Sequence, residues 1–137
     1  MQRRTQQRAA IVEAIREAGR PLAPREIHEL ARRKIPEIGI ATVYRAIKDL
    51  LSDQKLTAVE VPGAPPRYEV AGLTHHHHFL CRSCDRMMDI LGCPGDLAAY
   101  APPGFTVESH ELTLVGLCLD CSSPRRSRRN RSRKLSR

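Results

Sequence analysis

The chain has 137 residues, which fits one ordinary domain or two small ones, and it carries a formal net charge of +8. Aromatic residues make up only 4% of the sequence and tryptophan is absent, so we expect an aliphatic core. The sequence has neither an apolar run of about 20 residues nor the apolar stretch of a secretion signal, and we therefore expect a cytoplasmic protein with no membrane partner.

Helical periodicity predicts two short helices at the start of the chain. Apolar residues recur at helical spacing from Thr5, the expected N-cap, to about Ala18, and Gly19 closes this helix. A second helix begins near Pro24, and Pro36 prevents its continuation. Two short helices in succession are typical of a helical DNA-binding unit.

A third helix is predicted from Ile40 to Ser52. At about 100° per residue, one side of it carries Val43, Ile47 and Leu50, and Arg45 lies opposite. An outward face with small residues, a threonine and an arginine can enter a major groove, where arginine reads guanine edges or grips phosphate. Taken alone, the face could equally be ordinary solvated surface.

The elements that follow the third helix favour DNA binding. Two strand-like runs, Leu56 to Val61 and Arg67 to Val70, are separated by the turn-rich sequence PGAPP. Three helices and a hairpin predict a winged helix over residues 1–70, with the third helix in the major groove and the hairpin on the adjacent backbone. Residues 71–74 are expected to be a hinge.

Residues 75–121 are predicted to mix strands with one helix. The expected elements are a strand through the histidines, a cysteine turn, a strand near Met87 to Leu91, a helix around Asp96 to Tyr100, and a final strand near His110 to Leu117. A unit this small generally needs a staple such as a bound metal.

Two cysteine pairs supply that staple. The chain contains Cys81-x-x-Cys84 and, further on, Cys118-x-x-Cys121, and two such pairs provide four thiolates for a tetrahedral zinc. The two-residue spacing lets a tight turn point both sulfurs inward. A single CxxC could be a redox motif, and disulfides are the other alternative, but a reducing cytosol keeps thiols free. We therefore predict a structural zinc site.

Four consecutive histidines precede the first cysteine pair. If this segment is extended, its side chains alternate, so His76 and His78 face one way and His75 and His77 the other. One run could then serve two metal sites. An expression tag or a His-rich surface tract is the alternative, but the run is internal and fused to the cysteine turn.

The basic excess lies entirely in the C-terminal tail. Residues 122–137 hold eight basic residues and no acidic one, and the preceding residues balance at fifteen of each. Such a like-charged run is predicted to be a disordered arm, which would attract nucleic acid by counterion release. A solubilising terminus is the equally weighted alternative.

Four stretches of the chain, in this order and spacing, resemble the ferric uptake regulator family of metal-responsive repressors: IGIATVYRAIKDL, PPRYEV, HHHHFLCRSC and SHELTLVGLCLDC. The resemblance covers residues 3–121. It implies an α+β chain, with a winged-helix DNA-binding domain followed by a small α/β dimerisation domain that carries a four-cysteine zinc site. It also implies that the protein is not an enzyme.

The same resemblance implies how the protein would act. A homodimer would hold a structural Zn²⁺ and a regulatory divalent metal, Fe²⁺, Zn²⁺ or Mn²⁺, at the hinge between its domains. Binding of the regulatory metal would close the two winged helices onto palindromic double-stranded operator DNA.

Carried over by position, the resemblance implies three metal sites and a DNA surface. The structural zinc falls on Cys81, Cys84, Cys118 and Cys121. The regulatory hinge site falls on Glu69, His76, His78 and Asp89. A further site in the dimerisation domain falls on His75, His77, Asp96 and His110. DNA contacts are expected from Thr42, Tyr44 and Arg45, with backbone contacts from Arg3, Arg4 and Arg8.

Two positions depart from the family pattern. Pro21 stands where the family often has a hinge-site histidine, and His28, a water or Cys93 could substitute for it. Val70 stands near the place of the hinge cysteine of the zinc-responsive branch. Cys93 itself could be a sulfur ligand, a redox-sensitive thiol or a small buried hydrophobe. The sensed metal therefore stays open, and a peroxide-sensing regulator of the same family is an alternative.

Two further alternatives come from other classes of protein. A zinc hydrolase or deaminase would need an open coordination position and a motif such as HExxH, or HxE with PCxxC, and the sequence contains neither. A zinc-ribbon RNA-binding or adaptor protein would rely on the arginine-rich tail.

Overall fold

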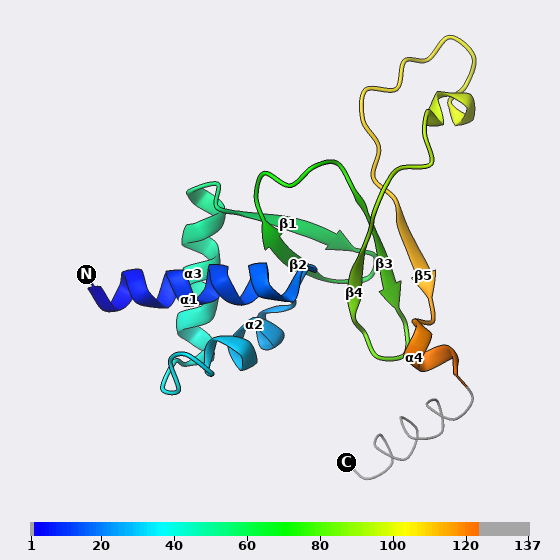
Figure 1. Ribbon diagram of the computed structural model, residues 1–137. Coiled ribbons are helices and arrows are strands. Elements are labelled where there is room, and N and C mark those ends of the chain that lie inside the picture. Colours follow the sequence, from blue (N-terminus) through cyan, green and yellow to red (C-terminus); the bar gives the residue numbers. More distant parts are fainter. Residues whose placement is uncertain (1, 124–137) are drawn as a thin grey trace. The chain divides into compact units, whose positions relative to one another are not determined.

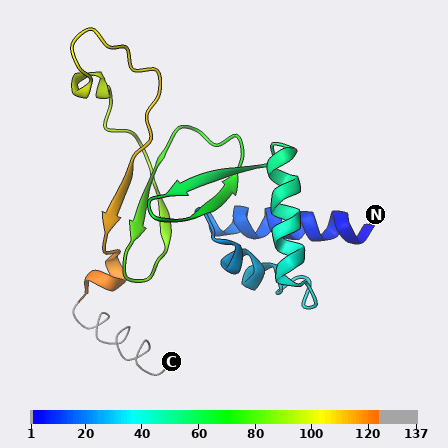
Figure 2. The ribbon, with the colours of Figure 1, turned by 180° about the vertical axis from the view of Figure 1, so that it is seen from behind.

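The computed structural model describes residues 2–123, so most of the predicted basic tail lies outside the described residues. The chain forms two compact units, one ending at Thr74 and the other beginning at His75. Both units contain helical and strand segments (Figures 1 and 2), which confirms the predicted α+β class. Within residues 2–123, no helix combines the length and the apolar character that a bilayer crossing requires.

The N-terminal unit is a winged helix, as predicted. Its elements are α1 (Gln2–Ala18), α2 (Pro24–Ala31), α3 (Ile40–Ser52), β1 (Leu56–Val61) and β2 (Ala64–Val70). β1 and β2 pair antiparallel as the wing. Backbone bonds in both directions between Leu22 and Tyr68, each 2.9 Å, tie the segment between α1 and α2 to the wing. The three helices and the hairpin therefore fold around one core.

The core of this unit is aliphatic. The predicted apolar face of α3 is confirmed, since Val43, Ile47 and Leu50 are buried. They pack with residues that the other helices and the wing contribute: Ile11, Ile15, Leu22, Ile27, Ala31, Ile38, Ala46 and Leu56. Burial of these side chains is the main term that stabilises the unit.

Some boundaries differ from the sequence prediction. α1 begins at Gln2, so Thr5 lies inside the helix and is not its N-cap. α2 ends at Ala31, well before Pro36, because the next residues form tight turns in which Arg33 N–H donates to the Leu30 carbonyl. The wing turn is shorter than PGAPP, since Gly63 takes a left-handed φ of 69° and the following prolines lie on β2.

The C-terminal unit is a small three-stranded sheet. Its strands β3 (His77–Cys81), β4 (Met87–Ile90) and β5 (Thr113–Gly116) are ordered β4-β3-β5, with β4 antiparallel and β5 parallel to β3. A 3-10 turn, η1 (Leu97–Tyr100), and a short helix, α4 (Leu119–Ser122), complete it.

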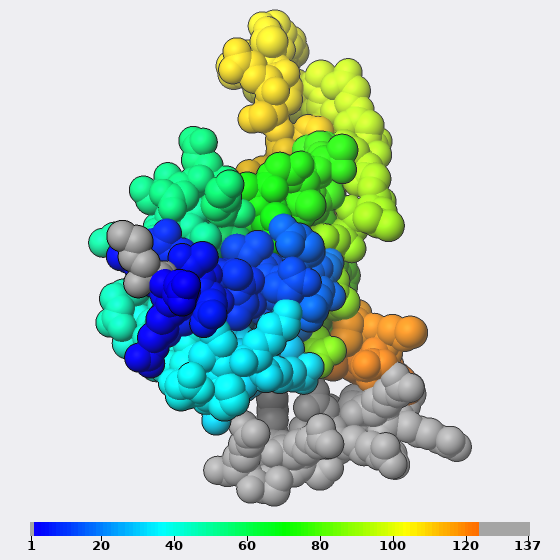
Figure 3. Space-filling model, turned by 60° about the vertical axis from the view of Figure 1, so that its left-hand side comes forward, coloured from blue at the N-terminus to red at the C-terminus, as the bar shows by residue number. Residues whose placement is uncertain are grey.

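The segment between η1 and β5 projects from the sheet as an extended loop (Figures 1 and 2) and forms the yellow protrusion in Figure 3. Phe105, in this loop, is 70% exposed. The buried apolar residues of the unit are few, chiefly Leu80, Met87 and two cysteines. A core this small needs the additional cross-link that the cysteine pairs offer.

We expect Ile27→Ala to lower the free energy of unfolding by about 2–5 kcal/mol, because Ile27 is fully buried and truncation leaves a cavity among aliphatic neighbours. Chemical denaturation of the full chain measures this change. Glu29→Ala, an exposed position on the same helix, should change the value by less than about 0.5 kcal/mol. Equal effects of the two substitutions would contradict the core assignment.

Candidate metal centres and nucleic-acid interface

The four cysteines of the two CxxC pairs meet at one end of the small sheet. Cys81 ends β3, Cys84 lies in the turn to β4, and Cys118 and Cys121 follow β5 at α4. Their sulfurs all lie within 4.8 Å of one another, and the Sγ atoms of Cys84 and Cys118 are 3.8 Å apart. Two sulfurs bound at about 2.3 Å on tetrahedral corners are separated by about 3.8 Å, so the cluster fits Zn²⁺. The predicted four-cysteine cluster is therefore present.

The pKa values of the cysteine thiols in this cluster favour the binding of a cation. Burial raises the pKa of Cys81, but the backbone N–H groups of Cys84, Cys118 and Ser83 outweigh it and lower the pKa to about 6. Burial and the neighbouring thiols raise the pKa of Cys84 to about 12 and also raise the pKa of Cys121. One thiolate is thus stabilised by the fold, while further thiolates need a positive ion among them.

A second cluster lies across strands β3 and β4. His78 and Asp89 are direct partners in the antiparallel register. Asp89 Oδ1 lies 3.5 Å from His78 Nε2 and 3.7 Å from His76 Nε2, and the two rings meet edge to face with centroids 4.7 Å apart. The structure therefore brings His76, His78 and Asp89 together. Two imidazoles and a carboxylate form a ligand set that suits zinc, iron or manganese.

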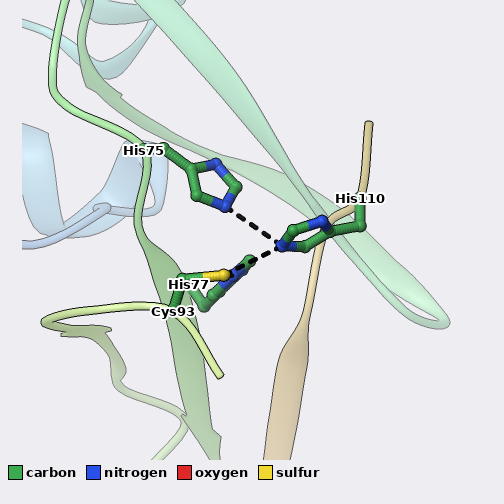
Figure 4. A group of neighbouring side chains, drawn as sticks. All are labelled: His75, His77, Cys93 and His110. Carbon is green, nitrogen blue, oxygen red and sulfur yellow. Dashed lines mark hydrogen bonds between the residues drawn. The ribbon is translucent and has the colours of Figure 1, made fainter. Parts of the chain in front are cut away.

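The third cluster contains His75, His77, His110 and Cys93, with their donor atoms within 4.8 Å of one another (Figure 4). Burial, followed by the neighbouring histidines, lowers the pKa of His77, so its imidazole stays neutral, which is the form that binds metals. Asp96, predicted for this group, is not part of it. Its Oδ1 accepts a 2.9 Å hydrogen bond from Ala98 N–H and caps η1.

The structure gives other places to the residues considered as substitutes in the hinge site. His28 Nε2 is 2.9 Å from the carbonyl oxygen of Ile38, a contact that connects α2 to the approach to α3. Cys93 lies with His77 and His110, not with His76. Glu69 is not such a substitute: it lies on β2 opposite Thr57 and is buried, and its place in the hinge site stays a prediction. Sequence reasoning left the role of Cys93 open because its neighbours depend on strand pairing.

The predicted DNA face of α3 is exposed. Tyr44 is 54% exposed, and Arg45 donates a 3.2 Å hydrogen bond to Thr42 Oγ1. A surface hollow between α1 and α3 is lined by Arg3, Arg4, Gln7, Arg8, Thr42, Arg45, Ala46, Lys48 and Asp49. The concentration of cationic side chains in this hollow is suited to the phosphate backbone of a nucleic acid.

One carboxylate organises two of the predicted backbone-contacting arginines. Asp49 Oδ2 lies 2.8 Å from Arg4 Nη2 and 2.7 Å from Arg8 Nη2, and Asp53 lies 3.4 Å from Arg8 Nη1. Hydrogen bonds from Arg4 and Arg8 lower the pKa of Asp49, so the carboxylate stays ionised. The structure thus places both arginines on α1 against α3, at the edge of the exposed helix face.

Comparisons with known proteins agree with this arrangement. The sequence model of the ferric uptake regulator family matches residues 2–115. The chain is 32% identical over 122 residues to the transcriptional regulator FurA of Mycobacterium tuberculosis, covering 86% of this chain and 82% of that protein. It is 31% identical over 128 residues to the zinc uptake regulation protein of the same species, covering 88% and 95%.

A solved structure is similar in fold as well as in sequence. The Helicobacter pylori ferric uptake regulator Fur, described as having three functional metal-binding sites, superimposes with a TM-score of 0.67 at 25% identity. The similarity covers 85% of this chain and 80% of that one. The architecture of both units is therefore shared with a known regulator.

We expect Cys121→Ser to abolish retention of a chelator-resistant zinc ion at the four-cysteine cluster, because three thiolates cannot close a tetrahedral site. The thermal unfolding midpoint should fall, since structural zinc contributes on the order of 10 kcal/mol to folding. Metal analysis after dialysis against a chelator and calorimetry measure both effects. Leu119→Ser, at an 85% exposed position in the same turn, should keep the ion. Undiminished zinc in Cys121→Ser would contradict the site.

Proposed function

The chain belongs to the ferric uptake regulator family, a family of transcriptional regulators and not of enzymes, and from this we propose that it represses transcription by metal-dependent binding to palindromic operator DNA as a homodimer. The observation that carries the proposal is the cluster of His76, His78 and Asp89 in a chain whose other unit is a winged helix. Such a regulator acts in the cytoplasm on double-stranded DNA.

The regulatory metal would be Fe²⁺, Zn²⁺ or Mn²⁺ held by His76, His78 and Asp89, with Glu69 supplied by the wing. A ligand shifts a conformational equilibrium only through its different affinities for the two states. A site that takes ligands from both units has this property, because coordination is complete only in one arrangement of the chain. Converting a mostly open population into a mostly closed one takes about 5.5 kcal/mol of preference.

DNA would be read by α3. Support for this comes from its exposed face, where Thr42, Tyr44 and Arg45 offer hydrogen-bonding and cationic groups. Arg3, Arg4 and Arg8 at the edge of the hollow would grip phosphates on either side of the contacted groove. The wing would rest on the adjacent backbone, as in other winged helices.

The homodimer would form through the C-terminal unit. β5 is an edge strand of the described sheet, and its Leu114 and Val115 are 47% and 57% exposed. An exposed apolar edge strand is a template for pairing with another chain. Leu91, Tyr100 and Phe105 enlarge the exposed apolar surface of the unit. A twofold pairing of two such surfaces would bury them and present two winged helices to a palindrome.

We expect His76→Ala to abolish the metal response of DNA binding. The effector coupling, typically about 5- to 150-fold, should fall to near unity because the regulatory metal loses a ligand. Fluorescence anisotropy on a duplex selected by the wild-type protein, with and without added Fe²⁺, Zn²⁺ or Mn²⁺, measures this. Glu108→Ala, which removes an exposed charge from the same unit, should leave the response unchanged. A retained response, or loss of metal-independent dimerisation, would refute the assignment.

Arg45→Ala should weaken binding to the selected duplex by about 1–3 kcal/mol and relax discrimination between sequences, as expected for a base contact. Arg3→Ala should weaken all duplexes alike and lower the salt-dependence slope by about one, as expected for a phosphate contact. Titrations at several salt concentrations separate the two effects. Arg25→Ala, at an exposed position on α2, serves as the charge-matched control. If Arg45→Ala bound every duplex like the wild type, α3 would not be the reading helix.

A further inference from the structure

The cluster of His75, His77, Cys93 and His110 has the spacing of a loaded metal site. His110 Nε2 lies 3.2 Å from His75 Nε2 and 3.1 Å from Cys93 Sγ, and His77 Nε2 lies 3.4 Å from the same sulfur. In Figure 4 the side chains point toward a common centre. Nitrogens at about 2.0 Å and a sulfur at about 2.3 Å from a tetrahedral zinc would be about 3.3 to 3.6 Å apart.

The strand topology explains why these four side chains meet. His77 is the first residue of β3 and His75 lies two residues before it, and Cys93 follows the end of β4, which runs antiparallel to β3. His110 precedes β5, which runs parallel to β3. The start of β3, the end of β4 and the start of β5 therefore share one end of the sheet, opposite the four-cysteine cluster. Backbone pairing of the three strands sets this end of the sheet, and His75, Cys93 and His110 lie within three residues of a strand end.

Two glycines turn the chain so that the sulfur faces the histidines. Gly92 and Gly95 flank the Cys93-Pro94 dipeptide with left-handed φ values of 93° and 101°. The Cys93 sulfur also lies 3.7 Å from the Gly95 carbonyl oxygen. Cys93 is exposed while His77 is 1% exposed, so a cation can enter from the cysteine side and reach a buried ligand.

We propose that Cys93 is the fourth ligand of a closed site of three histidines and one cysteine that selects a zinc-class cation over Fe²⁺ and Mn²⁺. Three imidazoles and one thiolate saturate a tetrahedral ion, which leaves no open position for substrate or oxygen. A thiolate in place of a carboxylate favours borderline-soft ions such as Zn²⁺ and Co²⁺ and disfavours the harder Mn²⁺. Binding releases the Cys93 thiol proton to solvent, as the sulfur–metal bond forms.

This inference goes beyond the proposed repressor function and does not depend on it, because the site lies within the C-terminal unit and its test involves no DNA. It also implies that the two histidine clusters around β3 prefer different metals. The cluster of His76 and His78 includes the Asp89 carboxylate, which suits iron or manganese. The cluster of His75 and His77 includes the Cys93 thiol instead. The chain would then hold zinc at a second position while another metal is sensed.

Cobalt spectroscopy tests the thiolate directly. The full chain, loaded with one zinc equivalent to fill the four-cysteine cluster, is titrated with Co²⁺ alone. We expect a near-ultraviolet sulfur-to-cobalt charge-transfer band that saturates at one Co²⁺ per chain. Cys93→Ser should remove the band and weaken Co²⁺ binding at this site by about 100-fold or more. His76→Ala, in the neighbouring cluster, should keep the band, and His110→Ala should weaken it.

Two outcomes would overturn the proposal. A band that persists in Cys93→Ser would place the bound cobalt on the thiolates of the four-cysteine cluster. Cobalt bound by the wild-type chain without any charge-transfer band would exclude sulfur from the site. Cys93→Asp provides a matched test of selectivity: a carboxylate in place of the thiolate should lower the ratio of Zn²⁺ to Mn²⁺ affinity by at least about tenfold. An unchanged ratio would also refute the role of Cys93.

Discussion

Strand β3 is hydrogen-bonded on both sides, and the metal chemistry of the C-terminal unit depends on this constraint. β4 and β5 fix its register, so that each of its side chains is assigned to one of the two faces. A slip by one residue would exchange the two histidine pairs and remove Cys81 from its cluster. The pairing thus allows one short strand to serve three groups of ligands, one at its far end and two near its start.

Much of the fold and part of the metal sites could be predicted from the sequence. Helical periodicity, Gly19 and the order of the elements predicted the winged helix, because helix spacing depends on neighbours a few residues away, whereas the expected cap Thr5 and the extent of the wing turn were wrong. The paired CxxC motifs predicted the cysteine cluster from ligand chemistry, because four thiolates suit one tetrahedral zinc, and strand alternation separates the four histidines into two pairs. Short-range spacing was therefore sufficient for the scaffold, and spacing together with ligand chemistry for the four-cysteine cluster.

The membership of the third cluster could not be obtained in this way. Whether Cys93 or Asp96 meets the histidines depends on where β4 ends relative to β3 and on the turn made by Gly92 and Gly95. Asp96 has a competing local use, since its carboxylate satisfies a backbone donor of η1. Strand pairing between distant segments and local capping decided the outcome, and neither is visible in the spacing of single residues.

The ion pairs of Asp49 with Arg4 and Arg8 have a thermodynamic consequence. An arginine side chain carries up to about 2 kcal/mol of rotamer entropy, which a partner must offset when it immobilises the group. Arg8 is only 28% exposed and is held by two carboxylates, whereas Arg4 is 70% exposed and held by one. Arg8 has therefore lost more of its freedom before any polyanion arrives, and its ordering adds less to the cost of association than that of its more mobile neighbour.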